Sequence, residues 1–206
     1  MSEMLTFTGG FAATNGYVLE APGGWVVVDA PPGMGGFLRE RGIEVAALLL
    51  THSHLDHVMD AAEVAAGGCP VYAWGESTPE ERLEPLFAQW TGVAVRVPPY
   101  GVTHPLCGEV GREVEVAGLA VRVAHVPGHS ADSLVYVVEG AGLMFSGDTL
   151  MAGGVGRSDF PGGSHEVLLA GIRREILGWP AGMVIYPGHG PATTVGEELR
   201  SNPYLS

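Results

Sequence analysis

Lysine is missing from this sequence. All ten basic residues among its 206 are arginines, they face 23 acidic residues, and the formal net charge is −13. Without lysine the chain has no Walker-type nucleotide site and no Schiff-base nucleophile. An acidic chain without basic runs also binds nucleic acids poorly, because Lys and Arg supply most of the affinity for phosphate. We therefore expect no nucleic-acid partner.

Long hydrophobic runs and clustered cysteines are missing as well. No apolar run approaches the roughly 18 residues of a membrane span, and the first residues lack the basic and apolar regions of a secretory signal. Cys69 and Cys107 lie far apart and form no disulfide framework, so we expect them to be buried thiols. These absences predict a cytoplasmic protein without a membrane partner.

Hydrophobic residues are nevertheless plentiful. They make up 46% of the chain, and charged residues only 16%, so the chain can bury a core despite its 32 glycines and 15 prolines. The length suits one domain, residues 1–206, and leaves a homo-oligomer open. The expected partner is a small molecule.

Short apolar stretches bounded by Gly and Pro predict the elements. In the first half we expect strands at 17–19, 25–28, 46–50 and 71–73, with helices at 37–41, 61–66 and 79–89. In the second half we expect strands at 114–116, 119–123, 134–138, 143–145 and 183–185, a helix that Ser164 caps and that ends at Leu177, and a helix at 195–200. Strands followed by helices in each half predict an α/β (α+β) fold, with two packed sheets and outer helices.

Three of the eight histidines lie within six residues, His52-Ser53-His54-Leu55-Asp56-His57, directly after a predicted strand. His52 and His54 point to the same side of an extended segment, and Asp56 and His57 follow in the turn into a helix. Imidazoles and a carboxylate are ligands of Zn, Mn and Fe. The hexamer therefore indicates a metal site at the carboxyl end of a strand.

Three later sites share one pattern, a single His or Asp beside glycine just after an apolar strand. They are Pro127-Gly128-His129, Gly147-Asp148-Thr149 and Pro187-Gly188-His189. Each alone is typical of a turn, but together with the hexamer they offer five His and two Asp, which suits two ions better than one. Two ions sharing a hydroxide carry out hydrolysis.

These motifs resemble the metallo-β-lactamase superfamily over nearly the whole chain. The resemblance implies a four-layer αββα sandwich with the metals at one edge. It implies that His52, His54 and His129 hold the first ion, that Asp56, His57 and His189 hold the second, and that Asp148 bridges both. It also implies that Asp29 supports the ligand loop, although from its position Asp29 is equally a turn residue.

Within the superfamily, residues 147–163 and the C-terminal PGHGPATT and NPYL segments are similar to the glyoxalase II-like group. That resemblance places Arg157 where a basic residue meets a glutathione carboxylate. The alternative for Arg157 is a structural ion pair with Asp159.

The resemblance implies a hydrolase in which a hydroxide bound by two divalent ions attacks a small thioester or ester, including glutathione conjugates. Asp56 would orient this hydroxide and is the candidate catalytic residue. Zinc is the first choice of metal, with iron or manganese as alternatives. A persulfide dioxygenase with one Fe(II) on His52, His129 and Asp148 is a second hypothesis, because Gly-Arg-Ser-Asp-Phe and Asn202-Pro203 also resemble that group. A non-enzymatic metal-binding module is a third.

Overall fold

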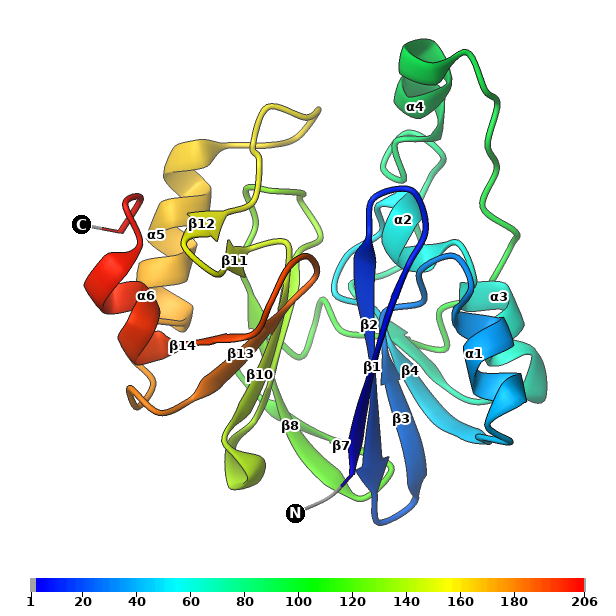
Figure 1. Ribbon diagram of the computed structural model, residues 1–206, viewed down its shortest axis with the longest axis horizontal. Coiled ribbons are helices and arrows are strands. Elements are labelled where there is room, and N and C mark those ends of the chain that lie inside the picture. The colour runs from blue at the N-terminus through cyan, green and yellow to red at the C-terminus, as the bar shows by residue number, and fades with distance from the viewer. Residues whose placement is uncertain (1–2, 206) are drawn as a thin grey trace.

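Two six-stranded sheets face each other in the computed structural model, which describes residues 3–205 (Figure 1). The first sheet contains, in spatial order, β1 (Met4–Gly9), β2 (Thr14–Ala21), β3 (Gly24–Val28), β4 (Val45–Leu49), β5 (Val71–Ala73) and β6 (His104–Pro105). Its first three strands pair antiparallel, and β3 to β6 run parallel. Parallel neighbours need crossovers, and these contain α1 (Met34–Glu40), α2 (Leu55–Val58), α3 (Ala61–Val64), the 3₁₀ turn η1 (Ala65–Gly67) and α4 (Glu84–Thr91).

The second sheet runs in the order β14 (Thr193–Thr194), β13 (Val184–Pro187), β10 (Leu143–Gly147), β9 (Leu134–Val138), β8 (Leu119–His125) and β7 (Glu113–Val116). Only β10 and β13 pair parallel. Their crossover contains the small hairpin β11 (Leu150–Met151) and β12 (Gly154–Val155), then α5 (His165–Glu175). The 3₁₀ turn η2 (Glu139–Ala141) joins β9 to β10, and α6 (Val195–Ser201) follows β14. Figure 1 shows α5 and α6 outside this sheet, and α1 and α3 outside the other.

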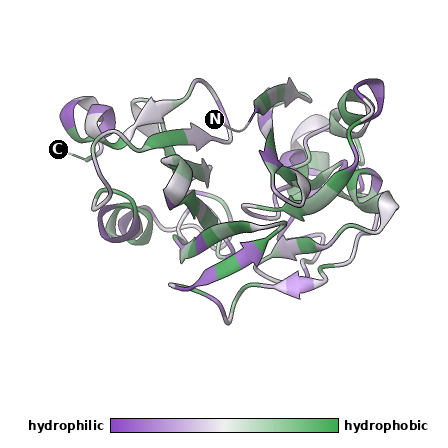
Figure 2. Ribbon diagram, turned by 90° about the horizontal axis from the view of Figure 1, so that it is seen from below, coloured by the Kyte–Doolittle hydropathy of each residue, from purple (hydrophilic) through white to green (hydrophobic). Residues whose placement is uncertain are grey.

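The central strands β2, β3, β4, β9 and β10 are largely buried on both faces, so neighbouring residues enter different cores. Val26 and Val28 of β3 join Tyr136 and Phe145 of the second sheet in a core between the sheets. Val27 belongs instead to the core beneath the helices of the first sheet. Double-sided burial explains why the strands read as continuous apolar runs without polar alternation. In Figure 2 the strands are largely green, while the flanking helices alternate green and purple.

The α5 helix illustrates how the outer layers form. The Ser164 side chain accepts a hydrogen bond from the Val167 backbone N–H and so caps the helix, as predicted. Leu168, Ile172 and Ile176 recur every four residues on one face and pack in a third core against the second sheet. Three cores separate four layers, and the predicted αββα sandwich is therefore confirmed.

Several details differ from the predictions. The helix expected at 79–89 begins only at Glu84, because Leu83 adopts a left-handed φ of 61°, which ends any preceding helical turn. The helix expected at 37–41 begins earlier, at Met34. Strand β1, which has one half-exposed face, was not predicted.

The prediction of two buried thiols was wrong. Cys107 is exposed because it lies in the loop between β6 and β7, and Cys69 is half-buried. In residues 3–205 no helix combines the length and the apolar character needed to cross a bilayer.

Candidate metal centre

Residues 52–57 follow β4 at its carboxyl end, as predicted. His52 and His54 lie in an extended segment with their ring centroids 4.6 Å apart, and His54 is the N-cap of α2. Asp56 and His57 lie within α2 itself. The four side chains therefore face one centre from a strand end and the helix that follows.

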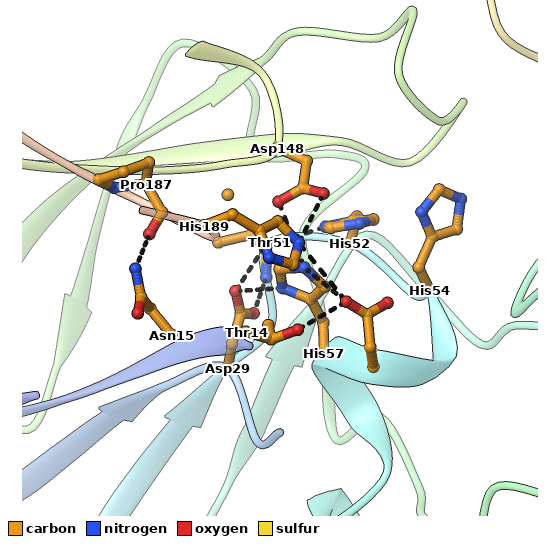
Figure 3. A network of polar contacts seen from close by, with 12 residues as sticks. Thr14, Asn15, Asp29, Thr51, His52, His54, His57, Asp148, Pro187 and His189 are labelled. Atoms are coloured by element: carbon orange, nitrogen blue, oxygen red, sulfur yellow. Dashed lines mark hydrogen bonds and ion pairs between the residues drawn. The ribbon is translucent and has the colours of Figure 1, made fainter. Parts of the chain in front are cut away.

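The second sheet brings the other three residues to the same place. His129 follows β8, Asp148 directly follows β10, and His189 comes two residues after β13. Figure 3 shows Asp148 and His189 facing the histidines of the first sheet. All seven residues predicted as ligands are thus brought together at one edge of the two sheets.

Glycine permits this close approach at two positions. A Cβ on Gly188 would lie 2.1 Å from Asp148 Oδ1 and 2.6 Å from His57 Cε1. Gly128 has a φ of 128°, and a Cβ there would lie 2.5 Å from the Leu168 backbone nitrogen. A side chain at either position would push His189 or His129 away from the centre.

Three groups of three donors form in the centre: two of them share no residue, and the third joins His52, His57 and Asp148. We call His52, His54 and His129 the first trio, and Asp56, His57 and His189 the second trio; within each trio the donor atoms lie within 4.8 Å of one another. In the first trio, His54 Nδ1 is 2.9 Å from His129 Nε2. In the second, Asp56 Oδ2 lies 3.6 Å from His57 Nε2 and 3.5 Å from His189 Nε2.

Asp148 lies between the two trios. Its Oδ1 is 3.3 Å from His57 Nε2, and its Oδ2 is 3.2 Å from His189 Nε2 and 3.5 Å from His129 Nε2. One carboxylate thus contacts members of both trios, the arrangement expected of a bridging ligand.

Unpaired polar atoms test whether these residues suit metal ions. Within residues 3–205, the buried side-chain atoms that lack a hydrogen-bond partner are His52 Nε2, Ser53 Oγ, His57 Nε2 and Asp148 Oδ1. Buried polar atoms are rarely left unpaired, and three of these four belong to the predicted ligands and face the centre. Imidazole and carboxylate donors at this density fit divalent transition metals.

Asp29 orients the second trio and the ligand loop together. Its carboxylate accepts hydrogen bonds from the Thr51 backbone N–H at 2.8 Å and the Thr51 hydroxyl at 2.7 Å. Its Oδ2 also lies 2.9 Å from His57 Nδ1, which leaves His57 Nε2 facing the centre. Asp29 holds a left-handed φ of 60°, which Asp tolerates better than most residues. This contact pattern is the supporting one that the resemblance implied.

Other residues fix the remaining imidazoles. The Thr51 hydroxyl lies 3.1 Å from His52 Nδ1, and the backbone carbonyl of Arg157 lies 2.7 Å from His129 Nδ1. In both rings the second nitrogen, Nε2, is thereby directed into the centre.

Sequence reasoning missed three residues of β2. The Thr14 hydroxyl donates to Asp56 Oδ2 at 2.6 Å. Asn15 Nδ2 donates to the Pro187 carbonyl at 3.1 Å, two residues before His189 (Figure 3). The Tyr17 hydroxyl donates to the same carbonyl at 2.6 Å. The sequence held one signal: Thr14 and Asn15 are polar residues at the start of an apolar strand.

The charges differ between the trios. Burial, reinforced by neighbouring imidazoles, lowers the pKa of His52 and His54 well below the usual value. Burial acts in the same direction on His57, but the carboxylates of Asp148, Asp56 and Asp29 outweigh it and hold the pKa of His57 well above its usual value. Burial likewise opposes ionisation of Asp148, but His57 and His189 hold the pKa of Asp148 well below its usual range.

Comparison with known proteins identifies the family. The profile of the Metallo-beta-lactamase superfamily matches residues 9–189. The chain belongs to the metallo-beta-lactamase superfamily. Hydroxyacylglutathione hydrolase GloC of Haemophilus influenzae is 34% identical over 173 residues, which cover 82% of this chain and 80% of GloC.

Two solved structures have the same fold. The BLEG-1 B3 metallo-beta-lactamase superposes with a TM-score of 0.86 at 31% identity, covering 99% of this chain and 100% of that one. TTHA1623, solved in a di-iron-bound form, superposes with a TM-score of 0.83 at 34% identity, covering 98% and 100%. The resemblance predicted from the motifs is thus confirmed at the level of superfamily and fold.

In this metallo-beta-lactamase superfamily member, an open pocket of about 410 Å³ lies over the centre. His54, Asp56, His129, Asp148 and His189 line it. Arg157 also lines the pocket, and it forms the ion pair with Asp159 that was the alternative prediction, with Nε and Nη2 donating at 2.8 Å and 2.7 Å. Arg157 therefore lies beside the site and pairs with Asp159, and its contact with a substrate carboxylate stays a prediction.

Proposed function

We propose that this chain is a metal-dependent hydrolase that cleaves a small thioester or ester. The observation that carries the proposal is the pair of donor trios around one shared carboxylate, at the floor of an open pocket. The first trio would hold one divalent ion, the second trio another, and Asp148 both. Membership of a superfamily of metallo-hydrolases and the similarity to GloC support it.

Divalent ions held there would acidify a bound water and polarise a carbonyl group. The chain itself supplies orientation and proton handling. Asp56 lines the pocket, and Thr14 fixes its Oδ2, so we assign Asp56 the role of orienting the attacking water and receiving its proton. A thioester in the pocket would meet this carboxylate from the open side.

The donor set is compatible with zinc, iron and manganese, since all three accept imidazole and carboxylate ligands. The relative TTHA1623 holds two irons, so iron stands beside zinc as a candidate. The second trio is assembled as fully as the first, which supports two ions over the single Fe(II) of a persulfide dioxygenase.

Metal analysis of the protein as isolated, followed by two assays on the same sample, tests the proposal. We expect about two ions per chain, the number that the donor count allows, and cleavage of a hydroxyacyl-glutathione thioester in a panel of thioesters and esters. One ion per chain with no cleavage of any of them would contradict it. Oxygen uptake with glutathione persulfide would favour the dioxygenase. Unchanged activity of the His57→Ala variant would favour the non-enzymatic metal-binding module.

The two halves of the chain contribute to both trios, which supports the prediction of one domain over residues 1–206. Oligomeric state and the cytoplasmic location stay predictions.

A further inference from the structure

Aromatic side chains form most of one side of the pocket. Phe11 from the β1–β2 loop, Phe87 and Trp90 from α4, and Phe160 from the loop before α5 all line it; we call these four the aromatic wall. Phe11 contacts Phe87 with ring centroids 4.7 Å apart, and Trp90 contacts Phe160 at 5.7 Å. Segments far apart in sequence thus build one apolar surface.

Two members of the aromatic wall, Phe11 and Trp90, are exposed to solvent. Phe11 is 61% exposed and Trp90 is 58% exposed, and both are among the most exposed large hydrophobic residues in 3–205. Large exposed hydrophobic residues gathered around a pocket mark a ligand surface. Leu83 and Leu86 extend this surface inward.

The wall reaches the metal centre directly. The Phe160 ring lies 5.5 Å from the His54 ring and 6.2 Å from the His129 ring, centroid to centroid. A group attached to a carbonyl at the floor of the pocket would therefore lie against Phe160 within a few bonds of the carbonyl.

Arg157 is the only arginine among the described residues that line the pocket, and its charge is already matched. Asp159 accepts two hydrogen bonds from it, and the guanidinium lies 4.0 Å from the Phe160 centroid and 5.5 Å from that of Trp90. A paired, stacked guanidinium holds aromatic rings in place. It offers little net positive charge to an anionic substrate.

We propose that the aromatic wall selects thioesters with an apolar acyl group, alkyl or aryl, and that Arg157 positions Phe160 and Trp90 without anchoring a substrate carboxylate. The inference rests on the proposed hydrolase function and names its substrate class. Trp90 and Phe160 are the residues that determine specificity, and the Arg157–Asp159 pair acts through them.

A series of acyl N-acetylcysteamine thioesters, from acetyl to hexanoyl, tests the selection. We expect kcat/KM to rise about two- to fourfold per methylene, the range for burying one CH₂ partly to fully. Trp90→Ala should flatten this rise, whereas Leu199→Ala, an exposed leucine of α6, should leave it unchanged. A flat or falling series in the unaltered protein would overturn the inference.

Inert thioethers test the same surface without catalysis. Calorimetry with metal-loaded protein would compare S-hexyl-N-acetylcysteamine with S-hexylglutathione, which carries the extra carboxylates. We expect affinities within about threefold, the gain of a weak, solvent-screened ion pair. Tighter binding of the glutathione compound by tenfold or more would overturn the role given to Arg157.

Two variants separate positioning from anchoring. Arg157→Met should weaken both thioethers by a similar factor, because Phe160 and Trp90 lose their support, and Asp159→Asn should strengthen S-hexylglutathione alone by freeing the guanidinium. If Arg157→Met weakens the binding of S-hexylglutathione alone, the result contradicts the inference. If the protein binds the thioethers as expected but cleaves no thioester, the hydrolase proposal fails while the apolar selectivity of the pocket stands.

Discussion

The two trios differ in composition, burial and charge. The first trio consists of three buried imidazoles, and the second combines two imidazoles with a carboxylate. The second is also the more open, since the side chains of His189 and Asp56 keep 26% and 16% of their surface exposed. The lowered pKa values of His52 and His54 keep these two imidazoles of the first trio neutral, whereas the raised pKa of His57 favours its protonated form in the second trio.

The same edge of the fold therefore offers two donor trios that differ in composition and charge. His52 and His54 are ready to bind an ion at neutral pH, because neither has a proton to lose. In the second trio His57 must release a proton first. Both trios reach the pocket, the first through His54 and His129 and the second through Asp56 and His189. Four measurements test whether the two trios differ in this way.

Removing the shared carboxylate should have the largest effect. In Asp148→Ala both ions lose a ligand, and we expect kcat/KM to fall about 10³-fold or more, the equivalent of several kcal/mol of metal-assisted stabilisation. Metal content after gel filtration, with thioester hydrolysis, is the measurement. Asp132→Ala, outside the cluster, is the control and should keep the metal content and the hydrolytic activity of the unaltered protein. An Asp148→Ala protein that retains both ions would show that Asp148 does not bridge the trios.

Single-trio variants come next. His54→Ala affects only the first trio and His189→Ala only the second, so each should retain about one ion per chain while the intact trio keeps its donors. Metal analysis of the two variants side by side measures this. If either variant loses both ions, the trios are not separate sites and the comparison fails.

Asp29→Asn should weaken the second ion more than the first. Asn keeps the left-handed backbone but removes the carboxylate that faces His57 Nδ1, and loss of such a partner costs about 10–100-fold in metal affinity. Competition with a chelator would measure each affinity. Asp60→Asn is the matched control, since Asp60 accepts hydrogen bonds from Gly33 and Gly35 outside the cluster. Equal weakening of both ions would mean that Asp29 acts mainly through the Thr51 loop.

The pH dependence of metal affinity should be stronger at the second trio than at the first. The raised pKa of His57 means that its proton stabilises the metal-free fold at low pH, and that this contribution is lost as pH rises through the raised value. Binding of the second ion displaces that proton, so its affinity should rise about tenfold per pH unit near neutrality. The affinity of the first ion should depend less on pH, because His52 and His54, with their lowered pKa values, carry no proton that the ion must displace. Titrations at pH 6, 7 and 8 measure both slopes, and parallel slopes would contradict the assignment.

Local patterns made most of the centre predictable from sequence. The 52–57 hexamer and the three glycine-flanked sites contain all seven donors, because these segments come after the strands β4, β8, β10 and β13 and strand ends converge at one edge of a sheet. The four-layer fold followed from short strands without polar alternation and from helices with one apolar face.

Contacts between residues far apart in the sequence could not be predicted from it. Thr14, Asn15 and Tyr17 act on residues more than forty positions away, and no local pattern records such a pairing. The aromatic wall was missed for the same reason, since Phe11 and Phe87 are neighbours only in the fold. The start of α4 was predicted too early because the left-handed turn at Leu83 has no glycine to announce it.

The bonds from Asn15 and Tyr17 to the Pro187 carbonyl join the two halves of the chain at the centre. Four of the seven donors precede the exposed loop at 107–112, and three follow it. The chain therefore carries its centre as two complementary fragments. If the chain were cut in this loop, each fragment alone would lack part of both trios. Recovery of metal binding on mixing the two fragments would therefore report that they have reassembled.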